Sequence, residues 1–122
     1  MPKKASAIVL DSWAAIAYLE DEPAGARVAD IIADAHEGGV PVLMSVINSG
    51  EIWSIIAREA SEEDAERDLD VLRGLGIEIV DATWDLTRRA ASFKSKNKMS
   101  YADCFHLGVL VRIFDAIALR IF

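Results

Sequence analysis

Short apolar runs alternate along this chain with longer stretches in which apolar residues recur every three or four positions. The runs, which suit buried parallel strands, occupy residues 7–10, 40–44, 77–80 and 116–122. The stretches of helical period cover residues 12–20, 24–36, 45–57, 61–75, 84–93 and 100–113. One strand followed by two helices, three times over, and then a last strand predicts an α/β fold, a three-layer α/β/α sandwich with a mainly parallel sheet.

Local residue choices mark where the predicted helices begin and end. The glycine pair at 38–39 ends the second helix, and residues 61–64 have the spacing of a capping box that opens the fourth. Either Asp81 or Thr83 can cap the fifth helix. The polar residues 94–98 after that helix are predicted to form a loop.

The size and composition of the chain predict one folded domain. Its 122 residues suffice for a single core, and we expect one domain over residues 1–122. With 52% hydrophobic and 27% charged residues, it lacks the composition of a disordered chain. Cys104 is the only cysteine and is expected to be a small buried residue, so no intrachain disulfide can form. The apolar run after the basic start is too short for a signal sequence or a membrane span, which predicts a soluble cytoplasmic protein with no membrane contact.

The formal net charge of −7 argues against binding nucleic acid through bulk electrostatics, because phosphate contacts need cations. Binding of RNA would therefore depend on a local basic patch or on a partner protein. The densest basic stretch comprises Arg88, Arg89, Lys94, Lys96 and Lys98. An ordinary solvated helix face and loop also explains each of these residues individually.

Three acids occupy positions suited to a metal site. Asp11 directly follows the first apolar run, Glu51 lies on the third predicted helix, and Asp103 opens the last helix. Parallel sheets bind ligands beyond the carboxyl ends of their strands, and carboxylates gathered there can hold a divalent cation such as Mg²⁺ or Mn²⁺. Four small polar residues nearby are candidates to orient these carboxylates or hold water: Ser12, Ser45, Asn48 and Ser100.

Each acid also has a purely structural explanation. Asp11 suits the N-cap of the helix that follows, and the segment 100–103 has the spacing of a capping box. Helical glutamates are usually solvated, but Glu51 stands among apolar residues, where an unpaired carboxylate is costly. His106 shares a helix face with Asp103, which would suit a ligand or a general base. A histidine packed near the core is the simpler interpretation.

Four aromatic residues fall at helical spacing from other apolar residues. We expect them to be core or dimer-contact residues and not platforms for base stacking. They are Trp13, Tyr18, Trp53 and Phe105.

Three segments, at residues 8–12, 44–52 and 99–105, resemble in order the motifs of the PIN domain, particularly in the VapC-type toxins of bacterial toxin–antitoxin pairs. The resemblance implies a Mg²⁺- or Mn²⁺-dependent endoribonuclease that hydrolyses RNA with metal-activated water. It also implies a homodimer inhibited by a cognate antitoxin, which inserts into the acidic site. Asp11, Glu51 and Asp103 match the acids that hold the metal in this family.

The end of the chain departs from the family pattern. The family usually has a further acid in a Thr-Gly-Asp-like turn after a late strand, and no such segment follows about residue 110 here. Asp115 is the only acid in the tail, and it would lie at the opposite edge of the sheet. An alternative function is therefore a weak or inactive PIN domain that serves as an antitoxin-binding or dimerisation module. A receiver-like domain is a more distant alternative, because the paired acids and the late lysine of that class are missing.

Overall fold

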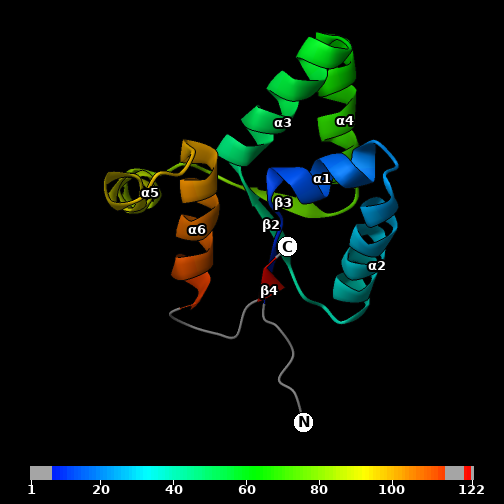
Figure 1. Cartoon of the computed structure of the whole chain (residues 1–122). Coiled ribbons are helices and arrows are strands. Elements are labelled where there is room, and N and C mark those ends of the chain that lie inside the picture. Colours follow the sequence, from blue (N-terminus) through cyan, green and yellow to red (C-terminus); the bar gives the residue numbers. More distant parts are fainter. Residues whose placement is uncertain (1–6, 115–119, 122) are drawn as a thin grey trace.

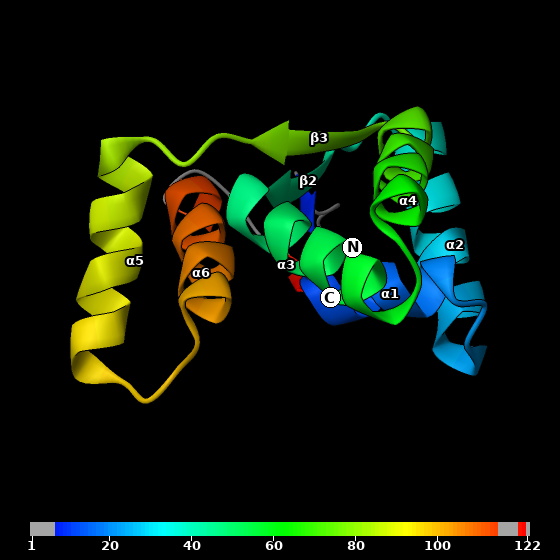
Figure 2. The same ribbon diagram turned by 90° about the horizontal axis from the view of Figure 1, so that it is seen from above.

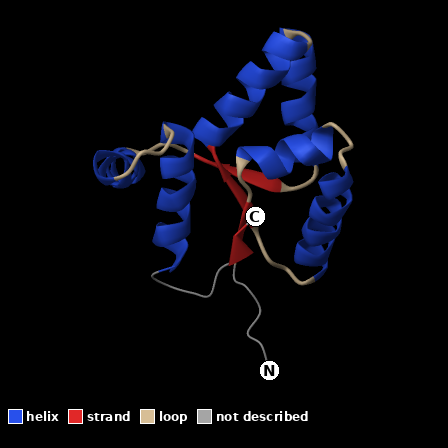
Figure 3. Ribbon diagram, viewed as in Figure 1, coloured by secondary structure: helices blue, strands red, loops and turns tan. Residues whose placement is uncertain are grey.

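A computed structural model describes the backbone of residues 7–114 and 120–121 and the side chains of residues 7–110. Its elements follow the predicted order, and helices surround a small central sheet (Figure 1, Figure 3). They are β1 (Ile8–Val9), α1 (Ser12–Leu19), α2 (Pro23–Glu37), β2 (Val42–Ser45), α3 (Val46–Glu59), α4 (Glu62–Gly74), β3 (Ile77–Val80), α5 (Trp84–Lys96), α6 (Tyr101–Phe114) and β4 (Arg120–Ile121).

The sheet is parallel, with strand order β3-β2-β1-β4. Ile8 of β1 stands in register with Val42 of β2 on one side and with Arg120 of β4 on the other. Of the predicted last strand, only residues 120 and 121 belong to the described part of the chain, and Asp115 lies outside it. Because every described strand runs in the same direction, the carboxyl ends of β1 and β2 lie at one edge of the sheet.

Side chains alternate between the two faces of the sheet and build two separate cores. Ile8 and Leu10 pack with residues of α1, α2, α3 and α4, whereas Val9 between them packs with α5 and α6. On β2, Val42 belongs to the first core and Leu43 packs against the second. Figure 2 shows α5 and α6 on one side of the molecule and α1, α2 and α4 on the other. This arrangement confirms the predicted three-layer α/β/α sandwich.

Helix starts agree with the capping residues in the sequence. In four helices a side-chain oxygen at the N-cap accepts a hydrogen bond from the backbone N–H three residues later, which satisfies a group that the helix leaves unpaired. These caps are Asp11, Ser45, Ser61 and Thr83, for α1, α3, α4 and α5. Among the helices of the described ranges, none has the length and apolar character needed to cross a membrane.

The structure corrects the predicted loop at residues 94–98. Helix α5 continues to Lys96, with Lys94 and Lys96 in its last turn. Lysine is a good helix former, and its positive charge is favourable near the negative end of the helix dipole. The polar composition of the segment was therefore compatible with a helix end.

The structure also corrects the placement of one aromatic residue. Phe105 is buried, and Tyr18 and Trp53 pack against the first core, as predicted. Trp13, however, is 72% exposed, which excludes a core position for this residue and leaves the dimer contact as a prediction. Helix α1 buries Ala15 on another side, and the indole of Trp13 stands outside the core.

Candidate functional site

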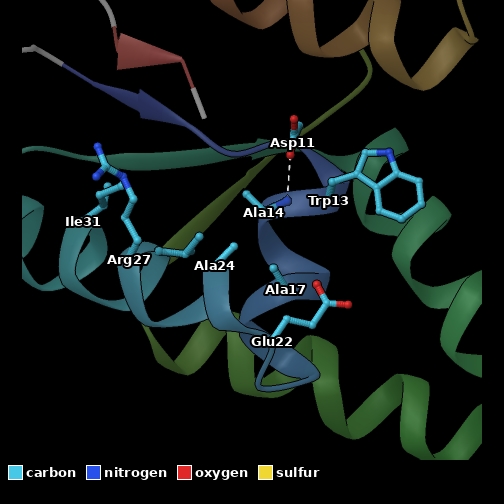
Figure 4. A pocket seen from close by; sticks show the side chains of 9 residues that line it. Asp11, Trp13, Ala14, Ala17, Glu22, Ala24, Arg27 and Ile31 are labelled. Carbon is cyan, nitrogen blue, oxygen red and sulfur yellow. Dashed lines mark hydrogen bonds between the residues drawn. The ribbon is translucent and has the colours of Figure 1, made fainter.

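Asp11 stands where β1 ends and α1 begins. Its Oδ1 accepts a hydrogen bond of 2.8 Å from the backbone N–H of Ala14, so the carboxylate caps α1 (Figure 4). The structural explanation of Asp11 as an N-cap is thereby confirmed. Because the cap uses Oδ1, the second oxygen of this half-buried carboxylate remains for another ligand.

A buried polar network lies directly beside Asp11. Ser12, Ser45 and Asn48 are each at most 2% exposed. Asn48 Nδ2 donates to Ser12 Oγ at 3.1 Å, the backbone N–H of Asn48 donates to Ser45 Oγ at 3.0 Å, and the Ser45 hydroxyl donates to Asn48 Oδ1. The network joins the start of α1 to the start of α3 and so fixes the carboxyl end of β1 relative to that of β2.

Glu51 and Asp103 both lie early in their helices. Glu51 is half-buried on α3, three residues after Asn48, and Asp103 is exposed in the first turn of α6. Negative charge is favoured at Asp103 by the positive end of the α6 dipole, whereas Glu51 lies beyond the first turn of α3. Ser100 Oγ accepts a hydrogen bond of 3.1 Å from the backbone N–H of Asp103. This bond confirms that the segment 100–103 caps its helix.

His106 connects two of the acids electrostatically. Its side chain is only 8% exposed, and burial lowers the pKa of the imidazole, while the charges of Asp11 and Asp103 and a hydrogen bond with the backbone of Leu10 act in the opposite direction. Within the described part of the chain, its Nδ1 has no hydrogen-bond partner. The charges of Asp11 and Asp103 therefore both act on one buried histidine, and the burial of His106 confirms the simpler expectation that it packs near the core.

The carboxylates suit a hard divalent cation by their chemistry, because Mg²⁺ and similar ions take oxygen ligands. Their arrangement is open: among the side chains of residues 7–110, no three Asp, Glu, His or Cys groups stand close enough together to hold a metal ion. The charges of Asp11 and Asp103 both raise the pKa of His106 against the effect of burial. The charge of Glu51 is not among these causes. The site residues thus surround the edge of the sheet without forming a closed metal site.

A pocket of about 420 Å³ opens next to Asp11, between α1 and α2. Its lining combines apolar side chains with an indole, two carboxylates and a guanidinium: Trp13, Ala17, Ile31, Asp11, Glu22 and Arg27 (Figure 4). The sequence did not indicate this pocket. Glu22 and Arg27 belong to no motif, and the exposed face of α1 carries no periodic pattern that identifies it.

Comparison with known proteins gives the family of this fold. The family model described as PIN domain matches residues 8–113. A crystal structure of VapC20 from Mycobacterium tuberculosis, described as a toxin that cleaves the sarcin–ricin loop, superimposes with a TM-score of 0.66 at 18% sequence identity, covering 95% of this chain and 89% of that one. No curated protein sequence matches the chain. The family match over nearly the whole described sequence shows that the chain belongs to the PIN domain family.

Proposed function

We propose that this chain is a Mg²⁺- or Mn²⁺-dependent endoribonuclease and the toxin component of a type II toxin–antitoxin pair. The observation that carries the proposal is the position of Asp11 where β1 ends, next to the buried contact between Ser12 and Asn48 of α3, in a chain of the PIN domain family. The structural similarity to VapC20 supports the toxin assignment through the shared fold.

Asp11, Glu51 and Asp103 would hold the metal, with side-chain rotation closing the open arrangement. A bound divalent cation activates water and offsets the negative charge that develops during phosphodiester hydrolysis. The network of Ser12, Ser45 and Asn48 would hold the acid-bearing ends of α1 and α3 at a fixed separation. The capping role of Ser100 would fix the direction in which Asp103 leaves α6.

The same proposal includes RNA as the substrate, a cognate antitoxin as the inhibitor, a homodimer as the assembled form and the cytoplasm as the location. The antitoxin would approach the acidic edge that contains Asp11 and Asp103. An acidic site of this kind suits a basic side chain of the partner, because opposite charges favour association.

RNA cleavage by site variants tests the proposed function. Asp11→Asn and Asp103→Asn should each abolish cleavage of RNA in the presence of Mn²⁺, whereas Asp34→Asn on the exposed side of α2 should leave the rate unchanged. Cleavage at the parent rate by both site variants would refute the assignment. Asparagine keeps the size of each side chain while removing its charge, so loss of activity would report on the carboxylates.

A second candidate function is a PIN domain that binds the antitoxin or dimerises without cleaving RNA. It is favoured by the open arrangement of the acids among residues 7–110. Titration with Mn²⁺ followed by calorimetry separates the two functions. Saturable binding that Asp11→Asn removes supports the nuclease, and the lack of saturable binding supports the module.

A further inference from the structure

We propose that the pocket between α1 and α2 binds one unpaired nucleotide of the RNA substrate, with its base stacked on Trp13 and a backbone phosphate at Arg27. This inference rests on the proposed ribonuclease function and adds a substrate subsite next to Asp11. The pocket and the candidate site are continuous, because the Asp11 side chain belongs to both. A strand of RNA bound in the pocket would therefore lead directly to the carboxylates.

The two helices that line the pocket, α1 and α2, pack closely against each other. Gly25 is buried at the start of α2, and a Cβ on this residue would lie 2.4 Å from the backbone oxygen of Ala17. Only glycine allows the two helices to approach so closely. The backbone N–H of Glu22 also donates to the Ala17 oxygen at 3.0 Å, which fixes the turn between the helices.

Trp13 provides an aromatic surface at the rim of this pocket, and the proposal thereby departs from the expectation that Trp13 is not a platform for base stacking. Its side chain is 72% exposed, although burial of an indole stabilises a protein more than burial of most other side chains. A nucleobase can stack on such a ring whatever its sequence, because every base has a π-face. In Figure 4 the indole of Trp13 lies on one side of Asp11 and the guanidinium of Arg27 lies on the other. The two groups can therefore contact different parts of one nucleotide strand.

Arg27 provides the cation that an acidic protein needs to attract RNA locally. The ion pairs found within residues 7–110 involve other arginines, so no carboxylate there forms a salt bridge with Arg27. A guanidinium that is not engaged by a carboxylate can bind a phosphate through two parallel hydrogen bonds. With a chain charge of −7, a positive group of this kind close to Asp11 is a distinct feature of the surface.

A carboxylate of the pocket restricts which base fits. Glu22, when ionised, can only accept hydrogen bonds, so the base must present N–H donors to it. Guanine offers two adjacent donors, N1–H and N2–H, to a single carboxylate. Uracil offers one donor between two carbonyl oxygens, which repel a carboxylate. We therefore expect guanosine to bind more tightly than uridine.

The size of the pocket favours a nucleotide over a segment of protein. Its volume of about 420 Å³ falls in the range of small-ligand sites, roughly 300–1,000 Å³, whereas an antitoxin helix would cover a longer groove. The combination of an aromatic ring, a cation and acceptor groups also matches the three parts of a nucleotide strand that proteins recognise: the base face, the phosphate and the base edge.

Binding of short RNA to the full chain tests this subsite. The probe is a fluorescein-labelled uridine heptamer with one central guanosine, measured by fluorescence anisotropy with EDTA so that no metal-dependent cleavage takes place. Trp13→Ala should weaken binding by about 5- to 150-fold, the effect of losing one stacked base. Trp84→Ala removes an equally exposed indole from α5, 73% against 72%, and should leave the affinity unchanged.

Two further comparisons test the phosphate and the base edge. Arg27→Gln should weaken binding and reduce the slope of log affinity against log salt by about one, whereas Arg73→Gln on α4 should not. Replacing the central guanosine by uridine should weaken binding to the parent chain, and Glu22→Gln should reduce this difference. Circular dichroism of each variant checks that its fold is unchanged.

The outcomes separate the subsite from the nuclease. If Trp13→Ala and Trp84→Ala bind the RNA equally well, or if the parent chain does not bind it, the subsite is overturned, even where the chain cleaves RNA. If binding depends on Trp13 and Arg27 but no cleavage occurs with Mn²⁺, the subsite stands and the nuclease assignment fails. If Trp13→Ala loses binding to a protein partner while its affinity for RNA is unchanged, the pocket belongs to the binding site for that protein instead.

Discussion

Asn48 donates a hydrogen bond of 3.1 Å from its Nδ2 to the Oγ of Ser12, a residue 36 positions earlier in the chain. The bond crosses from α3 to α1 inside the protein, where both side chains are shielded from water. Ser12 follows Asp11, and Glu51 lies three residues after Asn48. The position of one acid relative to the other therefore depends on this buried contact.

Asn48→Ala should destabilise the protein by about 1–3 kcal/mol, because it leaves the buried hydroxyls of Ser12 and Ser45 without their amide partner. Urea unfolding should show a lower midpoint with an unchanged slope. Asn97→Ala is a matched control, since the exposed Asn97 makes a single 3.1 Å bond to the Phe93 carbonyl. The control should change stability by no more than about 0.5 kcal/mol. Equal effects of the two variants would contradict the structural role of Asn48.

Two substitutions of Asp11 separate its capping role from its proposed catalytic role. Asp11→Ala removes the acceptor for the Ala14 N–H and should lower the free energy of unfolding by about 0.5–2 kcal/mol. Asp11→Asn keeps an equally good capping oxygen and should retain the parent stability, while losing RNA cleavage. Thermal unfolding and a cleavage assay on both variants check this. An active Asp11→Asn variant would leave Asp11 with the capping role alone.

Gly25→Ala should destabilise the pairing of α1 and α2. The added Cβ would meet the Ala17 oxygen at 2.4 Å, a backbone atom that cannot move without shifting α1, and such overpacking costs about 1–3 kcal/mol. Gly50→Ala is the matched control, because a Cβ at this exposed helical position meets nothing within 4 Å. It should stabilise the protein by about 0.5–1 kcal/mol. Effects of the same sign in the two variants, measured by urea unfolding, would argue against the close approach.

His106 should make stability depend on pH. Its folded-state pKa lies below the ordinary value of 6.5, chiefly because burial disfavours the charged imidazole. The unfolded chain therefore binds a proton more readily, and stability that is fully present above about pH 6.5 is lost as the pH falls through the folded-state pKa.

His106→Gln removes this titration and keeps His36, the other histidine of the chain. Below about pH 6.5 the parent protein should lose stability faster than the variant, and above that value the two stability curves should run parallel. Urea unfolding across pH in the presence of EDTA measures the difference. Parallel curves over the whole range would show that the imidazole titrates alike in the folded and unfolded chains.

The sequence by itself determined the order of the strands and helices, the places where several helices begin, and the family. These properties depend on local features. Alternation along β1 and β2 decides which side chains face each core, and a capping oxygen such as that of Ser61 or Thr83 acts on an N–H three residues away. The polar residues 94–98 show the limit of such rules, because a lysine-rich segment suits both a loop and the end of α5.

Only the tertiary structure decided how the site is built. The charge of Asp11 acts on His106 because β1 and α6 pack together through Val9 and their neighbours, which no local pattern specifies, whereas Asp103 shares the helix face of His106 by local spacing. The pocket at Trp13 likewise lies between α1 and α2, two helices whose close approach depends on Gly25. Contacts between segments far apart in the chain depend on the volumes of every side chain packed between them, so the geometry of the site follows from the whole core and not from its motifs.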